Sequence, residues 1–156
     1  GGLDVLVNVA GGFVWQPLAD DDGTSWPRMF ALNALTCRNM CAAALPALRQ
    51  AAAGRIVNIG AAGALQAGAG MGSYAASKAA VHKLTESLAA ELAGTACTVN
   101  AVLPTIIDTP ANRADMPGAD PGQWVQPQAI ADAILFLASP QARAISGALL
   151  PLSRGG

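Results

Sequence analysis

The chain has 156 residues and a formal net charge of −1, with 53% hydrophobic and 12% charged residues. This length suits one domain with its own core, and the composition excludes an intrinsically disordered chain. The near-neutral charge, without a basic block, gives little electrostatic basis for binding nucleic acid or a membrane surface. Three cysteines without a CxxC pair indicate buried, reduced thiols in a cytoplasmic protein.

The first half of the chain predicts two strands joined by a helix. Residues 3–10 (LDVLVNVA) form an almost unbroken apolar run, which is typical of a strand covered on both faces of a parallel sheet. Thr24 or Ser25 can cap a helix that is bent or ended near Pro46. A second buried strand follows over residues 55–61 (RIVNIGA).

The second half begins with a glycine-rich loop over residues 62–72. Ser73 is then expected to cap a long helix over residues 74–92. Residues 97–103 (CTVNAVL) predict a third buried strand. The segment 105–126 is expected to be a long polar loop, and loops of that length in a compact domain are usually functional or mobile.

A helix over residues 128–138 and a short strand over residues 148–152 complete the alternation of strands and helices. Connections of this length and helical content indicate parallel strands joined by right-handed crossovers. We therefore predict an α/β fold, a doubly wound parallel sheet with helices on both faces, as a single domain over residues 1–156. Ligands of such sheets bind beyond the carboxyl ends of the strands.

Tyr74 and Lys78 form the strongest chemical signal. They are four residues apart near the start of the long helix, so they share a face. An ammonium group beside a phenol lowers the pKa of the tyrosine. Tyr74 could then donate or accept a proton near neutral pH, as hydride transfer at a carbonyl or imine requires. The alternative is a surface Tyr-Lys pair on an amphipathic helix, and the spacing alone does not distinguish a catalytic pair from a surface pair.

Further polar or glycine-containing segments follow the first and third strands and end the second, and an asparagine lies mid-helix between the first two. They are Asn8-Val9-Ala10-Gly11, Asn33, Asn58-Ile59-Gly60 and the segment from Pro104 to Thr109. With Tyr74 and Lys78 they resemble, in type and order, the short-chain dehydrogenase/reductase family. The resemblance covers the whole chain, corresponds to roughly the last two thirds of a family member, and implies a Rossmann-like sheet.

The resemblance implies roles for individual residues. Tyr74 would be the general acid/base, Lys78 would bind the nicotinamide ribose and lower the pKa of Tyr74, and Asn33 would help to hold a water in a proton relay. The implied cofactor-binding residues are Asn8, Ala10 and Gly11 on the adenosine-ribose side, Pro104, Thr105, Ile107 and Thr109 beside the nicotinamide, and Ile59, Tyr74 and Lys78. No metal is implied.

One residue departs from the family pattern. Ala61 stands where the family usually has a serine, and an alanine side chain cannot bond a substrate oxygen. Together with Phe13 after the double glycine and the Asp108-Thr109-Pro110 segment, this resembles the dihydropteridine reductase-like branch. The substrate of that branch is a quinonoid dihydropterin, which accepts hydride readily and has less need of a serine. Asn33, by contrast, follows the general family pattern.

Several functional readings stay open. The chain is expected to be an NAD(P)(H)-dependent oxidoreductase acting on a small molecule, most closely like dihydropteridine reductase. The alternatives are a general alcohol dehydrogenase or ketone reductase, and a non-catalytic subunit used for binding or assembly. By resemblance a homodimer or homotetramer is expected, and neither nucleic acid nor membrane is an expected partner.

The chain contains no G-x-G-x-x-G loop, so the resemblance implies a sheet that is incomplete at its N-terminal side. The residue that selects NAD or NADP normally precedes the first strand of this chain, so the sequence gives no preference. The first strand would then present an exposed apolar edge, which tends to aggregate or to recruit another strand.

Six other side chains could each have a structural or a functional role. His82 is expected to pack or to lie at the surface rather than to react. Trp124 and Phe13 could flank a flat heterocycle, although a loop tryptophan more often anchors its loop on the core. Asp108, Arg113 and Asp120 could either form an ion pair that orders their loop or contact the substrate.

Overall fold

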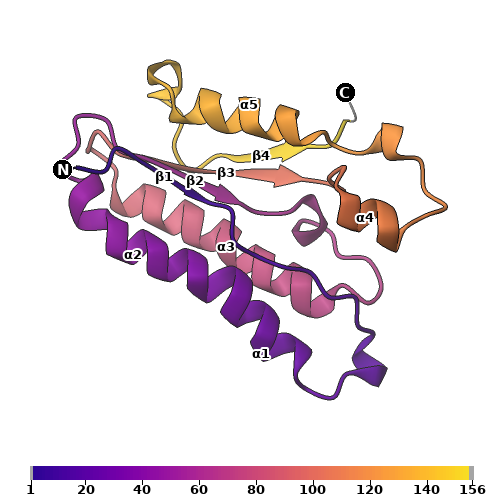
Figure 1. The fold of residues 1–156 in the computed structure, drawn as a ribbon. Helices are drawn as coiled ribbons and strands as arrows, with labels where there is room; N and C mark the ends of the chain where they lie inside the picture. The colour runs from indigo at the N-terminus through magenta and orange to yellow at the C-terminus, as the bar shows by residue number, and fades with distance from the viewer. Residues whose placement is uncertain (1, 155–156) are drawn as a thin grey trace.

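The computed structural model describes residues 2–154 of the chain, as strands and helices in alternation (Figure 1). The strands are β1 (Val5–Asn8), β2 (Arg55–Ile59), β3 (Thr98–Pro104) and β4 (Leu149–Leu152). The α-helices are α1 (Ser25–Met29), α2 (Thr36–Leu48), α3 (Gly72–Glu91), α4 (Pro110–Asp115) and α5 (Pro127–Ala138). A π-helical turn (Phe30–Leu35) joins α1 to α2, and 3₁₀ turns lie at Leu18–Asp20, Ala62–Ala64, Pro121–Gln123 and Pro140–Ala142.

The four strands form one parallel sheet in the order β1-β2-β3-β4. The two central strands are the continuous apolar runs of the sequence, and nearly every one of their residues is buried. This burial is expected for parallel strands that are covered on both faces. The predicted α/β fold with a parallel sheet is confirmed.

Helices cover both faces of the sheet. Consecutive strand residues point to opposite faces, so Ile56 packs with α2 and α3 whereas Val57 packs with α5. The first layer is a cluster of buried aliphatic side chains and cysteines, and the second gathers around Val102 and Ile130. Figure 1 shows α2 and α3 below the sheet and α5 above it.

The crossovers do not all have the same hand. Each step from β1 to β4 moves in the same direction across the sheet, but α2 and α3 lie on one face and α5 lies on the other. The crossover from β3 to β4 therefore has the opposite hand to the first two. The prediction of uniformly right-handed crossovers is wrong, because sequence periodicity shows that a helix has an apolar face but not which face of the sheet it covers.

Some helices begin, end or are capped at residues other than those predicted. Ser73 is not a cap: α3 begins one residue earlier at Gly72, and the Ser73 hydroxyl is buried inside the first turn. Pro46 lies within α2, which continues to Leu48. The segment 105–126 is not structureless, because Thr109 caps α4 by accepting a hydrogen bond from the backbone N–H of Asn112.

Within residues 2–154, no helix combines the length and the apolarity needed to cross a bilayer. The same residues contain no group of His, Cys, Asp and Glu side chains arranged to bind a metal ion.

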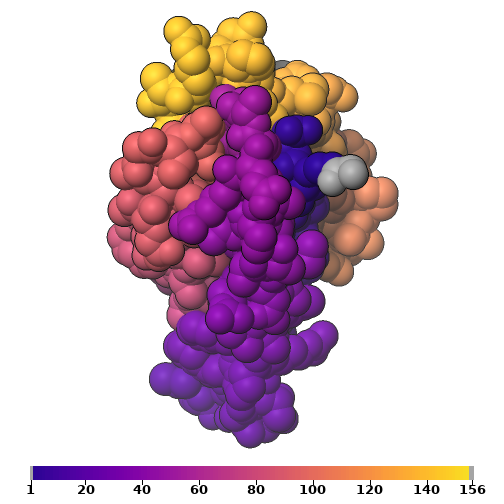
Figure 2. All heavy atoms as spheres, turned by 90° about the vertical axis from the view of Figure 1, so that its left-hand side faces the viewer, coloured from indigo at the N-terminus to yellow at the C-terminus, as the bar shows by residue number. Residues whose placement is uncertain are grey.

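Strand β1 lies at the edge of the sheet, with a partner on one side only among the described residues. The indigo N-terminal atoms lie at the surface in Figure 2. We predict that the 156-residue chain alone aggregates as its concentration rises, and that Val5→Lys, at a half-exposed position of this strand, reduces aggregation because a charge on an edge strand opposes further pairing. Light scattering across a dilution series measures this, and a wild-type chain that stays monodisperse would contradict it.

Candidate active site

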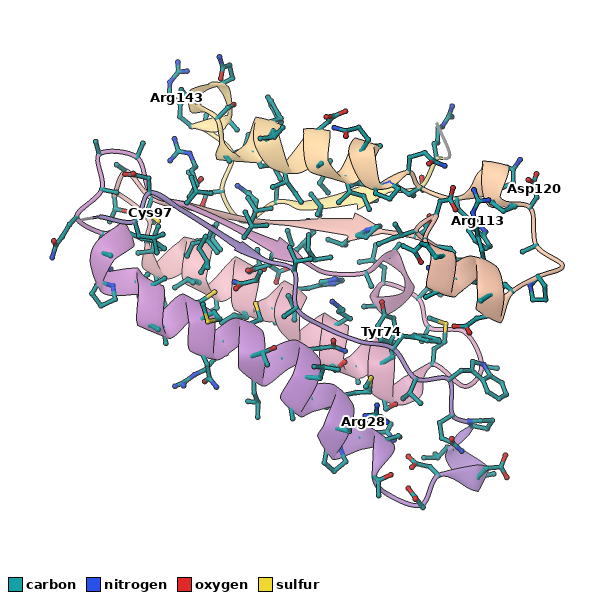
Figure 3. The ribbon with its side chains drawn as sticks, viewed as in Figure 1. Arg28, Tyr74, Cys97, Arg113, Asp120 and Arg143 are labelled. Atoms are coloured by element: carbon teal, nitrogen blue, oxygen red, sulfur yellow. The ribbon has the colours of Figure 1, made fainter. Side chains whose placement is uncertain are left out.

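The chemically active side chains gather where the parallel strands end. The carboxyl ends of β1, β2 and β3 lie at one edge of the sheet, next to the first turns of α3 and to α4 (Figure 1). Tyr74 lies at this edge in Figure 3, on the side of α3 that faces the strand ends. This is the position at which doubly wound sheets bind ligands.

Asn33 lies in the π-helical turn and is only 1% exposed. Its Oδ1 accepts from the backbone N–H of Gly12 at 2.8 Å, and its Nδ2 donates to the backbone oxygen of Gly12 at 3.1 Å and to Ser77 Oγ at 2.9 Å. Ser77 Oγ in turn donates to the backbone oxygen of Tyr74 at 2.7 Å. Asn33 therefore links the turn after β1 to the helix of Tyr74, and both of its N–H donors are used in doing so.

Lys78 is buried one helical turn from Tyr74, and its Nζ donates to the backbone oxygen of Ile59 at 2.8 Å. Burial lowers the pKa of Lys78 below its usual value. A Cβ atom at Gly11 would lie 2.7 Å from Asn33 Oδ1 and 3.3 Å from Lys78 Nζ. Only a glycine at this position lets the turn approach both side chains.

Tyr74 is half-buried, and its ring meets the ring of Phe13 edge to face at a centroid distance of 4.8 Å. Burial raises the pKa of Tyr74 above its usual value. The sequence predicted the opposite direction, from the charge of Lys78. That prediction is wrong, because the burial of the phenol, and not the charge of Lys78, sets the direction of the shift.

Ala61, at the position of the family serine, is buried, and its backbone N–H donates to His82 Nε2 at 3.2 Å. His82 is only 3% exposed, which agrees with the predicted packing role. Burial, followed by the charge of Lys78, lowers the pKa of His82. The imidazole is therefore neutral at pH 7, with its hydrogen on Nδ1.

The side chain of Asn8, which was predicted to line the adenosine-ribose side of the cofactor, is buried and bonded within the fold. Its Nδ2 donates to Asn58 Oδ1 at 2.8 Å, and Asn58 Nδ2 donates to Thr85 Oγ1 at 2.9 Å. The thiols of Cys37 and Cys41 lie against the same Asn58 oxygen. This buried network ties β1, β2, α2 and α3 together. Asn58 was expected at the sheet edge, but it lies inside β2 and is fully buried.

The predicted cofactor residues after β3 lie together near the sheet edge. Pro104 ends the strand, Thr105 is exposed, and Ile107 pairs with Val125 in an isolated bridge. The Thr109 hydroxyl accepts the hydrogen bond that caps α4, so this side chain stabilises the loop after β3. Ala10, in the turn after β1, is exposed at the same edge.

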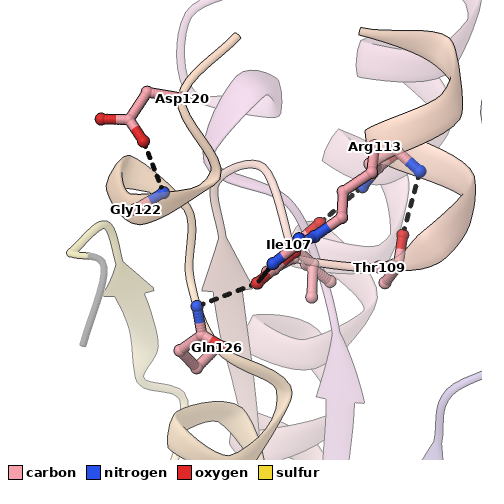
Figure 4. Close-up of polar contacts among 8 residues, drawn as sticks. Ile107, Thr109, Arg113, Asp120, Gly122 and Gln126 are labelled. Carbon is pink, nitrogen blue, oxygen red and sulfur yellow. Dashed lines mark hydrogen bonds and ion pairs between the residues drawn. The ribbon is translucent and has the colours of Figure 1, made fainter. Parts of the chain in front are cut away.

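The loop after β3 is ordered by its own polar side chains (Figure 4). Arg113 Nε and Asp108 Oδ1 are 2.6 Å apart, and Gln126 donates to the same carboxylate. The Arg113 side chain lowers the pKa of Asp108 to about 2. Asp120 takes no part in this pair but accepts from the backbone N–H of Gly122, and Trp124 is buried as an anchor of the loop.

A sequence model described as enoyl-(acyl carrier protein) reductase matches residues 1–155. The chain belongs to the short-chain dehydrogenase/reductase family. This is a family of NAD(P)-dependent oxidoreductases, and the match extends over the strands, the helices and the candidate site alike.

Named relatives of this short-chain dehydrogenase/reductase agree with the assignment. The 3-oxoacyl-(acyl-carrier-protein) reductase FabG of Vibrio harveyi is 34% identical over 99% of this chain and 67% of its own length. Cyclopentanol dehydrogenase of Comamonas testosteroni is 32% identical over 98% of this chain and 65% of its own.

The structure is similar to that of the aldohexose dehydrogenase of Thermoplasma acidophilum, with a TM-score of 0.91 and 30% identity, over 99% of this chain and 68% of that one. The chain thus spans about two thirds of the length of each of these three relatives.

Proposed function

We propose that this short-chain dehydrogenase/reductase transfers hydride between NAD or NADP and a small substrate, with Tyr74 moving the accompanying proton. The observation that carries the proposal is that Asn33 and Lys78 meet at the turn of Gly11, with the ring of Tyr74 against Phe13 of the same segment. Four separate segments supply these residues and the Ile59 oxygen, and hydrogen bonds within the chain connect them.

The site fits a nicotinamide ribose. The turn at Gly11 lies against Lys78, and Ile59 uses one of the three N–H donors of Lys78, so the other two are available to a ligand. A ribose hydroxyl placed there could accept from Lys78, while Ile59, Pro104 and Ile107 would provide apolar contacts at the strand ends. When bound, the cofactor supplies or accepts the hydride, and the residues of the chain position the reactants and move the proton.

In the direction of reduction, Tyr74 acts as the general acid. Because burial raises its pKa, the phenol carries its proton throughout the neutral range and can donate it to the substrate atom that becomes more basic. Asn33 keeps the helix of Tyr74 and the turn at Gly12 at a fixed separation through its bonds to both.

The proposed substrate is a carbonyl compound or the corresponding alcohol. The names of the three relatives support this class, since they are a reductase of 3-oxoacyl groups and dehydrogenases of cyclopentanol and an aldohexose. A quinonoid dihydropterin is the second candidate. Ala61 offers no hydroxyl to polarise a carbonyl, and the 57% exposed ring of Phe13 beside Tyr74 gives a flat apolar surface.

As further parts of the proposal, residues 1–156 belong to one domain, the protein assembles as a homodimer or homotetramer, and its location is cytoplasmic. The three cysteines, all buried and free, support a reducing compartment.

We predict that the full protein oxidises NADH or NADPH with members of a ketone panel. Phe13→Ala should raise KM by about 2- to 12-fold, the range that an aromatic contact provides, and only for flat heterocyclic acceptors. Phe136→Ala, on the far helix α5, is the matched control and should leave KM unchanged. Activity with quinonoid dihydropterin and none with ketones would favour the second candidate. No oxidation with any acceptor would count against both.

A further inference from the structure

We propose that His82 is a positioning residue of the site, which holds the backbone at Ala61 and, with Lys78, fixes the end of β2 against the helix that carries Tyr74. The inference rests on the proposed function, because it concerns the geometry of the same reacting centre. His82 does not touch the substrate in this proposal; it acts through the main chain.

The first support is the pair of hydrogen bonds from α3 to the end of β2. Lys78 and His82 are four residues apart, so they lie on one face of the helix. Lys78 Nζ donates to the oxygen of Ile59 at 2.8 Å, and His82 Nε2 accepts from the N–H of Ala61 at 3.2 Å. The two bonds flank Gly60, whose own N–H donates to the Val102 oxygen of β3 at 2.9 Å. Three consecutive residues are thereby fixed.

The second support is the close contact between the imidazole and Gly60. A Cβ atom at Gly60 would lie 2.5 Å from His82 Nε2 and 3.2 Å from Leu103 Cδ1. The imidazole therefore packs directly on the main chain, with no space for a side chain between them. The position of Ala61 relative to α3 is set by this ring and not by a flexible contact.

The third support is the charge state that the bond requires. Nε2 accepts a hydrogen bond only in the neutral imidazole. The charged groups that influence His82 are Lys78, Lys83 and Glu86 of α3; the two lysines disfavour the imidazolium and Glu86 favours it. The residues that contact His82 from the segment after β2 are Gly60 and Ala61, which are not titratable. Protonation would break the bond to Ala61 and place a second cation one turn from Lys78.

The test can be made without turnover, because His82 is the only histidine in the sequence. Long-range ¹H–¹⁵N spectra of the full chain should show the hydrogen on Nδ1 and an unprotonated Nε2, and the Ala61 amide signal should shift as the imidazole titrates. The transition should lie below the ordinary histidine pKa of about 6.5. A hydrogen on Nε2, or an Ala61 signal that does not follow the titration, would overturn the proposal.

Turnover gives the second readout. His82→Leu removes the acceptor, and we expect kcat to fall by about tenfold or more, with KM for the cofactor changed less than about twofold, because small displacements near a reacting centre are costly. His82→Gln keeps an acceptor and should restore most of kcat, but without the loss of rate at acidic pH that we expect of the wild type. Glu91→Gln, exposed on the same helix, is the control.

The outcomes separate this inference from the proposed function. Wild-type kcat and an unchanged acid limb in His82→Leu, alongside an inactive Tyr74→Phe, would overturn the role of His82 alone. Full activity of Tyr74→Phe would instead overturn the proposed function. If His82→Leu fails to fold, the His82→Gln pH profile and the imidazole spectra still decide the question.

Discussion

Replacing Tyr74 by phenylalanine should lower kcat for hydride transfer by about 10²- to 10⁴-fold, which is the contribution of a positioned general acid. The change removes the hydroxyl and keeps the ring, so the edge-to-face contact with Phe13 is preserved. We therefore expect cofactor affinity and the thermal midpoint to stay near the wild-type values. Stopped-flow oxidation of the reduced cofactor measures kcat, and fluorescence titration measures the affinity.

The wild type gives the pH dependence that this variant should lose. Because burial raises the pKa of Tyr74, the protonated phenol persists across neutral pH, and the rate of reduction should fall on the alkaline side as the proton is lost, in addition to the acid limb expected from His82. Phe13→Ala retains the hydroxyl and serves as a control that alters the ring contact alone. Wild-type turnover in Tyr74→Phe would exclude Tyr74 as the acid and would mean that another group supplies the proton.

Replacing Asn58 by alanine should lower the free energy of unfolding by about 2–4 kcal/mol, because buried polar groups lose their partners. Asn58 is fully buried, and its amide bonds both Asn8 and Thr85 across three elements. Alanine leaves the Asn8 amide and the Cys37 thiol without their acceptor and opens a small cavity.

Urea denaturation measures the loss. The control is Asn39→Ala, since the Asn39 side chain is exposed on α2 and bonds only the adjacent Arg38 among the contacts of the described residues. It should change the free energy of unfolding by less than about 0.5 kcal/mol. A loss below about 1 kcal/mol in Asn58→Ala would mean that the network is replaced by water or by local repacking.

The strands were predictable because burial on both faces leaves a continuous apolar run. The runs around Ile56 and Val102 located β2 and β3 to within two residues at each end. Tyr74 and Lys78 were predictable for a related reason, since a spacing of four places two side chains on the same helical face whatever surrounds them.

What the sequence did not show depends on long-range packing. The direction of the Tyr74 pKa shift follows from its burial, which no spacing of residues reveals. The π-helical turn that contains Asn33 and the bond from Ala61 to His82 arise where distant segments meet. Ser73 looked like a cap because serine favours that position, but the helix begins one residue earlier and buries it.

Because the last crossover has the opposite hand, the two parts of the site are attached to helices on opposite faces of the sheet. Tyr74, Lys78 and Asn33 are borne by helical segments of the layer below the sheet, whereas residues 105–126 connect β3 to α5, which lies above it. An insertion or deletion in that segment would change the wall facing the substrate without altering the spacing of the proton-transfer groups. We therefore expect substrate specificity to vary more among related proteins than the proton-transfer residues do, because the two parts of the site can change independently.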